Sequence, residues 1–318
     1  MKWFSLVAVL LVSAVQAQEY PNKPIRVVVP FAPGGFADTV TRVLGQHMEQ
    51  RIKWQFVVEN RPGGNGFIGT TAVQKAAPDG YTLLMAHTGE FAVNPALFND
   101  VPYELERDFV AITMVSDAPM LYLATASAPF NSFQELVAQA KSKPGSISFS
   151  SAGNGSINHL AGEWLAQAAG IQLLHVPYKG GAPAAAAVAA GDVHFGVMAA
   201  PGAMPHIKSG RGKVIGITTA KKSRLDPSWA TPRDANIPDL DASIWAGLFA
   251  PKGTPQAVVD RINKEVRETL ALPEVQKRFI ESTGGEAVGM SSADFLARIK
   301  ADAERYKRVV QKAGVKPG

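Results

Sequence analysis

The chain has no cysteine among its 318 residues. This absence excludes a disulfide framework, a thiolate metal site, a cysteine nucleophile and a lipid-modified cysteine behind a leader. Charge is sparse and mixed, with 32 basic against 27 acidic residues and a formal net charge of +5. The densest basic group, Lys221–Arg224, adjoins a loop at Asp226 and is interpreted as a solvated face. Since nucleic-acid binding needs a basic stripe or patch, no nucleic-acid partner is expected.

Long hydrophobic runs are missing after the N-terminus. Residues 1–17 are interpreted as an export signal, because Lys2 gives a basic start, Trp3–Val15 is almost wholly apolar and Ala17 is small enough for cleavage. A membrane anchor is the alternative, but this apolar stretch is shorter than the roughly 20 residues that span a bilayer. We therefore expect a mature protein from about Gln18 that is periplasmic, soluble and not lipid-anchored.

What the chain does contain is an alternation of short apolar runs and helical patterns, separated by glycine and proline. This order is typical of an α/β fold with mainly parallel sheets. We expect two lobes, each a mainly parallel sheet flanked by helices: a discontinuous first lobe of residues 24–120 plus 246–318, and a second lobe of residues 121–245. The two crossings between them predict a hinge, and a hinged pair of lobes can close around a ligand.

Two further features of this order are a break before the second lobe and the start of the last helix. Asp117–Pro119 is interpreted as a break, followed by a strand over Leu121–Thr125. The last helix begins at Ser291 or Ser292 and carries an apolar stripe, which is expected to pack on the first lobe. Binding of a partner to that stripe is the alternative.

Two strand–loop–helix turns of one design lie far apart in the sequence. In the first, strand Ile25–Pro30 leads into loop Phe31–Asp38; in the second, strand Ile147–Ser150 leads into loop Ser151–Ser156. Glycine lets the backbone approach a ligand closely, and the free N–H groups at the start of the following helix favour an anion. Two such turns on two lobes could grip the two ends of one small acid. Neither loop contains lysine or arginine, so backbone N–H, hydroxyl and amide groups must hold any carboxylate.

These loops and four further segments resemble the Bug family of periplasmic receptors, the substrate-binding proteins of tripartite tricarboxylate transporters. The matching segments are Pro30–Gly35 with Asp38 and Arg42, Val58–Gly66 with Gly69, Ala77–Leu83, Ser151–Ser156 with His159 and Leu160, His175–Gly180, and Gly247–Pro255. The resemblance covers the whole mature chain. It implies a two-lobed Venus flytrap, the periplasmic-binding-protein fold, that captures a carboxylated small molecule and delivers it to a membrane permease of two integral subunits.

The resemblance also implies that both gripping loops hold the ligand, often with ordered waters at its near carboxylate. The sequence departs from the family in the loop that follows Tyr81–Ala86. This loop reads His87-Thr88-Gly89-Glu90-Phe91, where serine and threonine are more usual. The departure leaves the identity of the ligand open.

The expected ligand-binding residues lie mostly in the two loops. In the first lobe they are Phe31, Ala32, Gly34, Gly35, Phe36, Asp38, Thr88 and Gly89, and in the second lobe they are Ser151, Gly153, Asn154, Gly155, Ser156, His159 and Tyr178. No catalytic residue, metal or cofactor is expected. The loop Asn60–Gly66 lacks the ending of a phosphate-binding P-loop and is expected to be a tight structural turn.

Several of these residues have a structural alternative. Asp38 in a first helical turn is expected to cap backbone N–H groups and order the Gly34-Gly35 turn, although it could meet a ligand ammonium or hydroxyl. Ser156 or Asn154 could cap its own helix. His159 could be a hydrogen-bonded structural histidine, and Phe31 could belong to the core.

Three classes of function follow. The first is a monomeric periplasmic receptor for a small aliphatic or aromatic mono- or dicarboxylate, which it delivers to a two-subunit inner-membrane permease. The second is a ligand-sensing co-receptor for a two-component sensor kinase. The third, more remote, is a secreted hydrolase built on Ser151 or Ser156 near His159, although the sequence has neither a Gly-x-Ser-x-Gly elbow nor a His-Glu-x-x-His pair.

Overall fold

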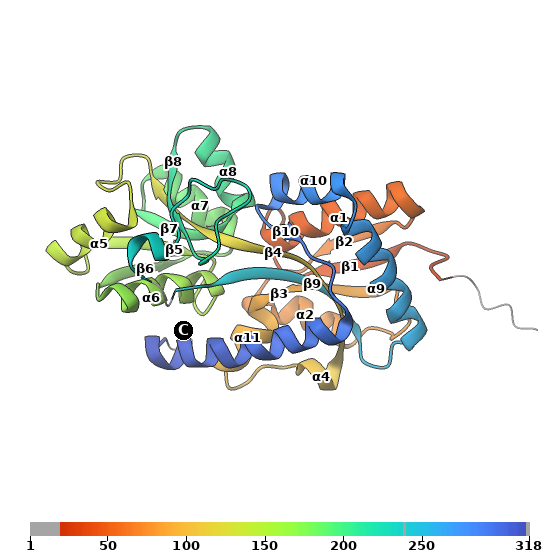
Figure 1. The fold of residues 1–318 in the computed structure, drawn as a ribbon. Coiled ribbons are helices and arrows are strands. Elements are labelled where there is room, and N and C mark those ends of the chain that lie inside the picture. Colours follow the sequence, from red (N-terminus) through yellow and green to blue (C-terminus); the bar gives the residue numbers. More distant parts are fainter. Residues whose placement is uncertain (1–19, 238–239, 316–318) are drawn as a thin grey trace, which may run out of the picture.

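The computed structural model describes residues 20–237 and 240–315, so the predicted export signal lies outside the described residues. In this part of the chain a curled ten-stranded sheet has the order β2-β1-β3-β9-β4-β7-β5-β6, with β8 and β10 also paired to β4. Helices cover its faces (Figure 1). The predicted α/β fold is confirmed. None of the helices in the described ranges is long and apolar enough to cross a membrane.

The first half of the sheet contains β1, β2, β3 and β9. Strand β1 (Ile25–Val29) lies between β2 (Phe56–Asn60) and β3 (Thr82–His87) and pairs with both in parallel. Strand β9 (Ser243–Pro251) runs antiparallel to β3. The helices of this half are α1 (Phe36–Ile52), η1 (Gly64–Gly66), α2 (Phe67–Gln74), the π-helix η2 (Gly89–Val93), α3 (Asn94–Leu97), α4 (Leu105–Asp108), α9 (Gln256–Leu270) and α10 (Pro273–Thr283), and a short strand β10 (Glu286–Ala287) follows them.

The second half contains β5 to β8. Strand β5 (Ile147–Ser151) lies between β6 (Leu173–Pro177) and β7 (Phe195–Ala199), again in parallel. Strand β8 (Gly212–Ile217) pairs antiparallel with β4. The helices of this half are α5 (Phe133–Ser142), α6 (Ile157–Ala169), α7 (Gly181–Ala190), α8 (Ala200–Lys208) and η3 (Arg233–Ala235).

One long strand joins the two halves. Strand β4 (Phe109–Thr125) has 17 residues; it pairs with β9 up to Pro119 and with β7 from Met120 onward. The predicted break at Asp117–Pro119 is therefore wrong. Pro119 is paired in register with Ser243, and the next N–H group, that of Met120, donates to Thr218 Oγ1 at 2.9 Å. The strand therefore continues past Pro119, although proline has no N–H group to donate to the ladder. The lobe boundaries predicted from the sequence stay a prediction.

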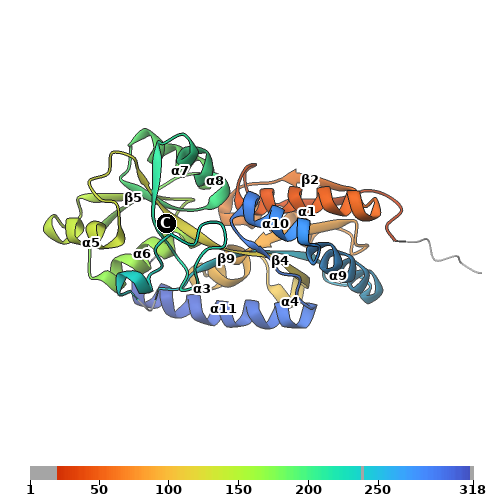
Figure 2. The same ribbon diagram turned by 45° about the horizontal axis from the view of Figure 1, so that its top comes forward.

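The last helix, α11 (Ser292–Ala313), runs along both halves (Figure 2). Its side chains Phe295, Ile299 and Tyr306 are buried, as the apolar stripe predicted. Its C-terminal part also contacts α6, because Gln167 Nε2 donates to the Lys312 carbonyl at 3.0 Å. Helix α11 thus packs on the first half, as expected, and also contacts the second half.

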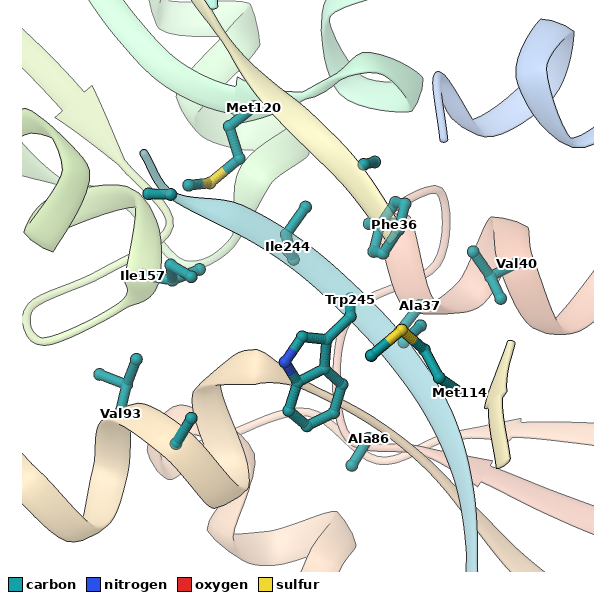
Figure 3. Packing of buried hydrophobic residues seen from close by; sticks show 14 of the residues in the cluster. Phe36, Ala37, Val40, Ala86, Val93, Met114, Met120, Ile157, Ile244 and Trp245 are labelled. Atoms are coloured by element: carbon teal, nitrogen blue, oxygen red, sulfur yellow. The ribbon is translucent and has the colours of Figure 1, made fainter. Parts of the chain in front are cut away.

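The core continues beneath the crossing strands. Trp245 on β9 is fully buried, and its indole N–H donates to Asp302 of α11 at 2.9 Å. Figure 3 shows Phe36 from α1 and Ile157 from α6 on opposite sides of Ile244. The beginnings of helices from both halves thus meet over β9.

Candidate functional site

An inner cavity of about 80 Å³ lies between the two halves. The loops that follow β1, β3, β5 and β6 contribute to its wall, and so does Ala199, the last residue of β7. The carboxyl ends of strands are where open α/β sheets bind ligands. A wider outer groove of about 670 Å³ shares Phe31, Ala32, Asn65, Ala152 and Gly180 with the cavity. The groove is the continuation of the cavity on the surface.

Four helices begin at the wall of the inner cavity. The N-cap residues of α1, α6, α7 and α8 all line it, and they are Gly35, Ser156, Gly180 and Ala199. In α1, α7 and α8 no side chain caps the first turn. The wall carries no Asp, Glu, Lys or Arg side chain among the described residues. Backbone N–H groups and positive helix ends therefore make the wall suitable for an anion.

Asp38 orders the first loop from behind. Its side chain is 3% exposed and accepts hydrogen bonds from the Gly34 N–H at 2.9 Å, from Arg42 at 3.0 Å and from Asn60 at 3.0 Å. Burial alone would raise the pKa of Asp38, but these hydrogen bonds outweigh it and hold the pKa below its ordinary value. Neither Asp38 nor Gly34 lines the inner cavity or the outer groove. These contacts agree with the expectation that Asp38 caps backbone N–H groups and orders the Gly34-Gly35 turn.

The second loop rests on a pair of stacked histidines. The rings of His159 and His175 are 3.7 Å apart and nearly parallel. His159 Nδ1 accepts the Gly155 N–H at 3.1 Å, and Ser151 Oγ lies 2.7 Å from His175 Nε2. Burial, together with the neighbouring His159, lowers the pKa of His175 to about 3. Ser151 and His159 therefore support the loop from behind the wall.

The hydrolase alternative would pair the hydroxyl of Ser151 or Ser156 with the imidazole of His159, and the structure shows other partners for these groups. Ser156 Oγ accepts the His159 N–H at 3.2 Å as the cap of α6, and it donates to the Gly153 carbonyl at 2.8 Å. The imidazole of His159 meets the Gly155 N–H instead of a hydroxyl. Both hydroxyls are thus engaged in holding the loop.

The predicted site residues fall into three groups. Those that line the inner cavity are Phe31, Ala32, Gly35, Phe36, Gly89 and Ser156. Those that line only the outer groove are Gly153, Asn154 and Tyr178. Those behind the walls are Gly34, Asp38, Thr88, Ser151, Gly155 and His159. Thr88, for example, is fully buried, and its Oγ1 accepts a hydrogen bond from the backbone N–H of Trp245 at 2.9 Å.

Sequence reasoning missed several wall residues. Asn60–Gly66 contains the expected tight turn, with Gly63, Gly64, Asn65 and Gly66 at positive φ. Asn65 also lines both hollows and donates to the Asn154 carbonyl at 2.8 Å across the gap. His87, at the end of β3, also lines the cavity. Gly180 and Gly181 follow a strand and begin a helix, which is the same design as the two predicted loops. That design was the signal that could have found them.

The entrance is narrow where the two halves meet. Gly155 has a φ of +72°, and a Cβ there would overlap the Leu97 side chain of the first half. Glycine is therefore needed at this point both for the backbone conformation and for the close approach. The Asn65 hydrogen bond and this contact hold the halves together beside the cavity.

Comparison with known proteins agrees with this architecture. The model of the tripartite tricarboxylate transporter family receptor matches residues 40–315. BugT of Bordetella pertussis is 32% identical over 307 residues, which cover 96% of this chain and 94% of BugT. The solved periplasmic binding protein BugD is 35% identical with a TM-score of 0.85, and the match covers 93% of this chain and 99% of BugD.

A second solved structure, an R. palustris protein with adipate, is 29% identical with a TM-score of 0.90 and covers 94% of this chain and 100% of that one. The family and the fold are those of solute-binding proteins, not of enzymes. The chain therefore belongs to the tripartite tricarboxylate transporter receptor family and is a solute-binding protein of the periplasmic transporter type.

Proposed function

We propose that this protein captures a small carboxylate in the cavity between its lobes and delivers it to a two-subunit membrane permease. The observation that carries the proposal is the convergence of four helix N-termini on one cavity whose wall bears no carboxylate and no lysine or arginine. A carboxylate there accepts hydrogen bonds from backbone N–H groups that would otherwise lack partners.

The remainder of the wall fits an apolar ligand body. Phe31, Phe36, Ile157 and Ile244 line the cavity between the helix ends. Adipate in the R. palustris relative, a carboxylate at each end of a short apolar chain, has this chemistry. We expect the ligand of this protein to be of the same class.

Closure of the two predicted lobes, residues 24–120 plus 246–318 and residues 121–245, encloses the ligand. Strands β4 and β9 are the two connections about which the lobes would turn. The Asn65 to Asn154 hydrogen bond is made across the entrance, so it must break when the lobes open. The ligand-binding role of the predicted residues that line the inner cavity depends on this closed form.

Thermal unfolding of the mature protein, residues 18–318, tests capture. The panel pairs aliphatic and aromatic carboxylates with their amides, which have the same shape without the charge. A carboxylate at a hundred times its dissociation constant adds about 2.7 kcal/mol, which raises Tm by several degrees, while its amide leaves Tm unchanged. A flat response to every carboxylate, repeated after refolding to remove any co-purified ligand, would contradict capture.

Delivery is tested in cells. Deleting the gene abolishes uptake of the responding carboxylate, and deleting either of the two permease subunits has the same effect. Uptake that persists in the receptor deletion would refute delivery and leave capture intact.

A further inference from the structure

His87 is the one ionisable side chain among the described residues that line the inner cavity. It is the last residue of β3. Other polar side chains of the wall are engaged within the protein: Asn94 Nδ2 donates to the Asn65 carbonyl, and Asn158 Nδ2 donates to the Val197 carbonyl. These two amide N–H groups are engaged as donors within the protein, whereas one ring nitrogen of His87 has no hydrogen-bond partner in the described chain.

The surrounding residues fix the orientation of the His87 ring. It stacks on Phe31 with centroids 4.1 Å apart and an interplanar angle of 18°. The Gly89 N–H donates to Nδ1 at 2.9 Å, and Glu90 Oε2 lies 3.1 Å from the same nitrogen. With Nδ1 held in this way, Nε2 is the ring nitrogen left for a ligand in the cavity that His87 lines. Within the described chain it has no hydrogen-bond partner.

Glu90 has no exposure to solvent and is held against His87. Its Oε2 also accepts the His87 backbone N–H at 2.8 Å, whereas its buried Oε1 has no hydrogen-bond partner in the described chain. A buried acid with an unpaired oxygen is costly, so its position beside a ring nitrogen indicates a role. A carboxyl group behind an imidazole typically orients the ring toward what it binds.

The hydrogen bond from Gly89 fixes which ring nitrogen of His87 carries the proton. Nδ1 accepts the Gly89 N–H, so the neutral ring carries its single proton on Nε2. The cavity side of His87 is therefore a hydrogen-bond donor and requires an acceptor from the ligand.

The positions of the donors assign the ligand two acidic ends. Three of the four helix N-termini, those of α6, α7 and α8, come from the second half and suffice for one carboxylate. On the proposed function, we infer that His87 Nε2 donates to a second carboxylate of the same ligand and that His87, positioned by Glu90, makes this receptor select dicarboxylates over monocarboxylates. Phe31, stacked on the ring, borders the body between the two ends.

Calorimetry of two His87 variants with paired ligands tests this inference. His87→Asn places an amide near the position of Nδ1 and removes the donor at Nε2, whereas His87→Gln places an amide N–H near Nε2. The ligands are short dicarboxylates and the monocarboxylates in which a methyl group replaces one carboxylate. The Asn variant loses about tenfold or more in affinity for the dicarboxylate and less than about twofold for the monocarboxylate. The Gln variant recovers most of the loss.

Circular dichroism and Tm of the unliganded variants confirm that they are folded. An equal loss for both ligands in the Asn variant, or no loss, overturns the inference, as does a wild-type preference for the monocarboxylate. In each of those cases the proposed function stands, because a carboxylate still binds. Failure of the wild-type protein to bind any carboxylate would instead refute the proposed function.

Discussion

The two walls of the cavity are built in different ways. The wall from the second half is mostly backbone: Ala152, Gly180, Gly181, Ala182 and Ala199 line it, the first turns of α7 and α8 have no side-chain cap, and the first turn of α6 is capped by Ser156. The wall from the first half is mostly side chain, with two phenylalanines, two asparagines and His87, and among the described helices of this half the N-cap residue of α1 lines it. One wall offers general anion donors, and the other offers shape and specific groups.

This difference indicates how a receptor can change its ligand without losing its affinity for acids. Backbone donors at helix ends do not depend on side-chain identity, so most substitutions leave them in place. Side chains such as Phe31 and His87 can be replaced one at a time, which alters the accepted body and the far end of the ligand. We therefore expect affinity to depend chiefly on the second wall and specificity on the first.

The supports behind the walls also differ. Asp38, Arg42 and Asn60 hold the first loop with a charged network. His159 and His175 hold the second loop as a stack whose His175 member stays neutral, since burial and its neighbour lower the pKa to about 3. Acid should therefore affect the two supports in different ranges of pH.

Ala182→Asp should have the largest effect, because it puts a charge of the wrong sign on the backbone wall. Ala182 is exposed in the first turn of α7 and lines the cavity. A carboxylate there opposes the ligand carboxylate at a cost of several kcal/mol, so affinity falls by at least about 100-fold. The unliganded protein keeps or slightly gains stability, because an acidic residue in a first helical turn is favourable. Calorimetry and Tm measure both effects.

Ala182→Asn is the matched control for charge. Its side chain has nearly the same size as that of aspartate, so binding within about threefold of wild type is expected if charge is what matters. If the Asn variant loses as much affinity as the Asp variant, the second wall discriminates ligands by shape. The contrast between a second wall of anion donors and a first wall of shape and specific groups is then wrong.

The fold could be predicted where the signals are local. Strand β1, loop and α1 were recognisable because an apolar run, glycines and a helical pattern follow one another within a few residues. Strand β4 was not, because Asp117 and Pro119 indicate a break, and only the distant partners Ser243 and Thr218 make a continuous strand possible. The contact of α11 with α6 likewise depends on residues far apart in sequence.

The same limit applies to the site. Gly35, Gly89 and Ser156 were predicted because glycine or a capping residue at a strand end has a local meaning. Asn65 and Ile244 become wall residues only when the halves meet, which no local pattern shows. Ser151 and His159 have the right chemistry for a ligand, but their hydrogen bonds are made to the loop itself.

Asn65→Ala should have an intermediate effect, because it removes the hydrogen bond that joins the walls at the entrance. Asn65 Nδ2 donates to the backbone carbonyl of Asn154 at 2.8 Å. Losing one such bond costs the closed form about 1 kcal/mol, so affinity falls about fivefold, through a faster off-rate. Stopped-flow measurement of ligand release checks this.

The chain provides a matched control in Asn154→Ala. The acceptor is the backbone carbonyl of Asn154, so this substitution leaves the bond intact, and affinity should stay within about twofold of wild type. A loss as large as that of Asn65→Ala would instead show that the Asn154 side chain itself contacts the ligand.

The smallest expected effect is on the pH dependence of stability, in which the histidine support of the second loop should differ from the Asp38 support of the first loop. An ordinary histidine, as in the unfolded chain, has a pKa near 6.5, whereas that of His175 in the folded protein is lowered to about 3. Between these values the unfolded state binds the additional proton, so stability falls as the pH drops through this range. Asp38 has its pKa lowered from 3.8, so its contribution is present above that value and is lost only in stronger acid.

His175→Gln isolates this contribution, since the amide can still meet Ser151 but cannot take up the proton. Urea unfolding at pH values from about 7.5 down to about 4.5, a range set by the ordinary pKa of histidine, should show a shallower loss of stability in the variant than in wild type. The histidines outside the stack contribute equally to both proteins, so the difference between the two slopes belongs to the stacked pair of His159 and His175. Parallel slopes would mean that the stacked pair takes up a proton within the folded protein, and the contrast between a neutral and a charged loop support would then fail.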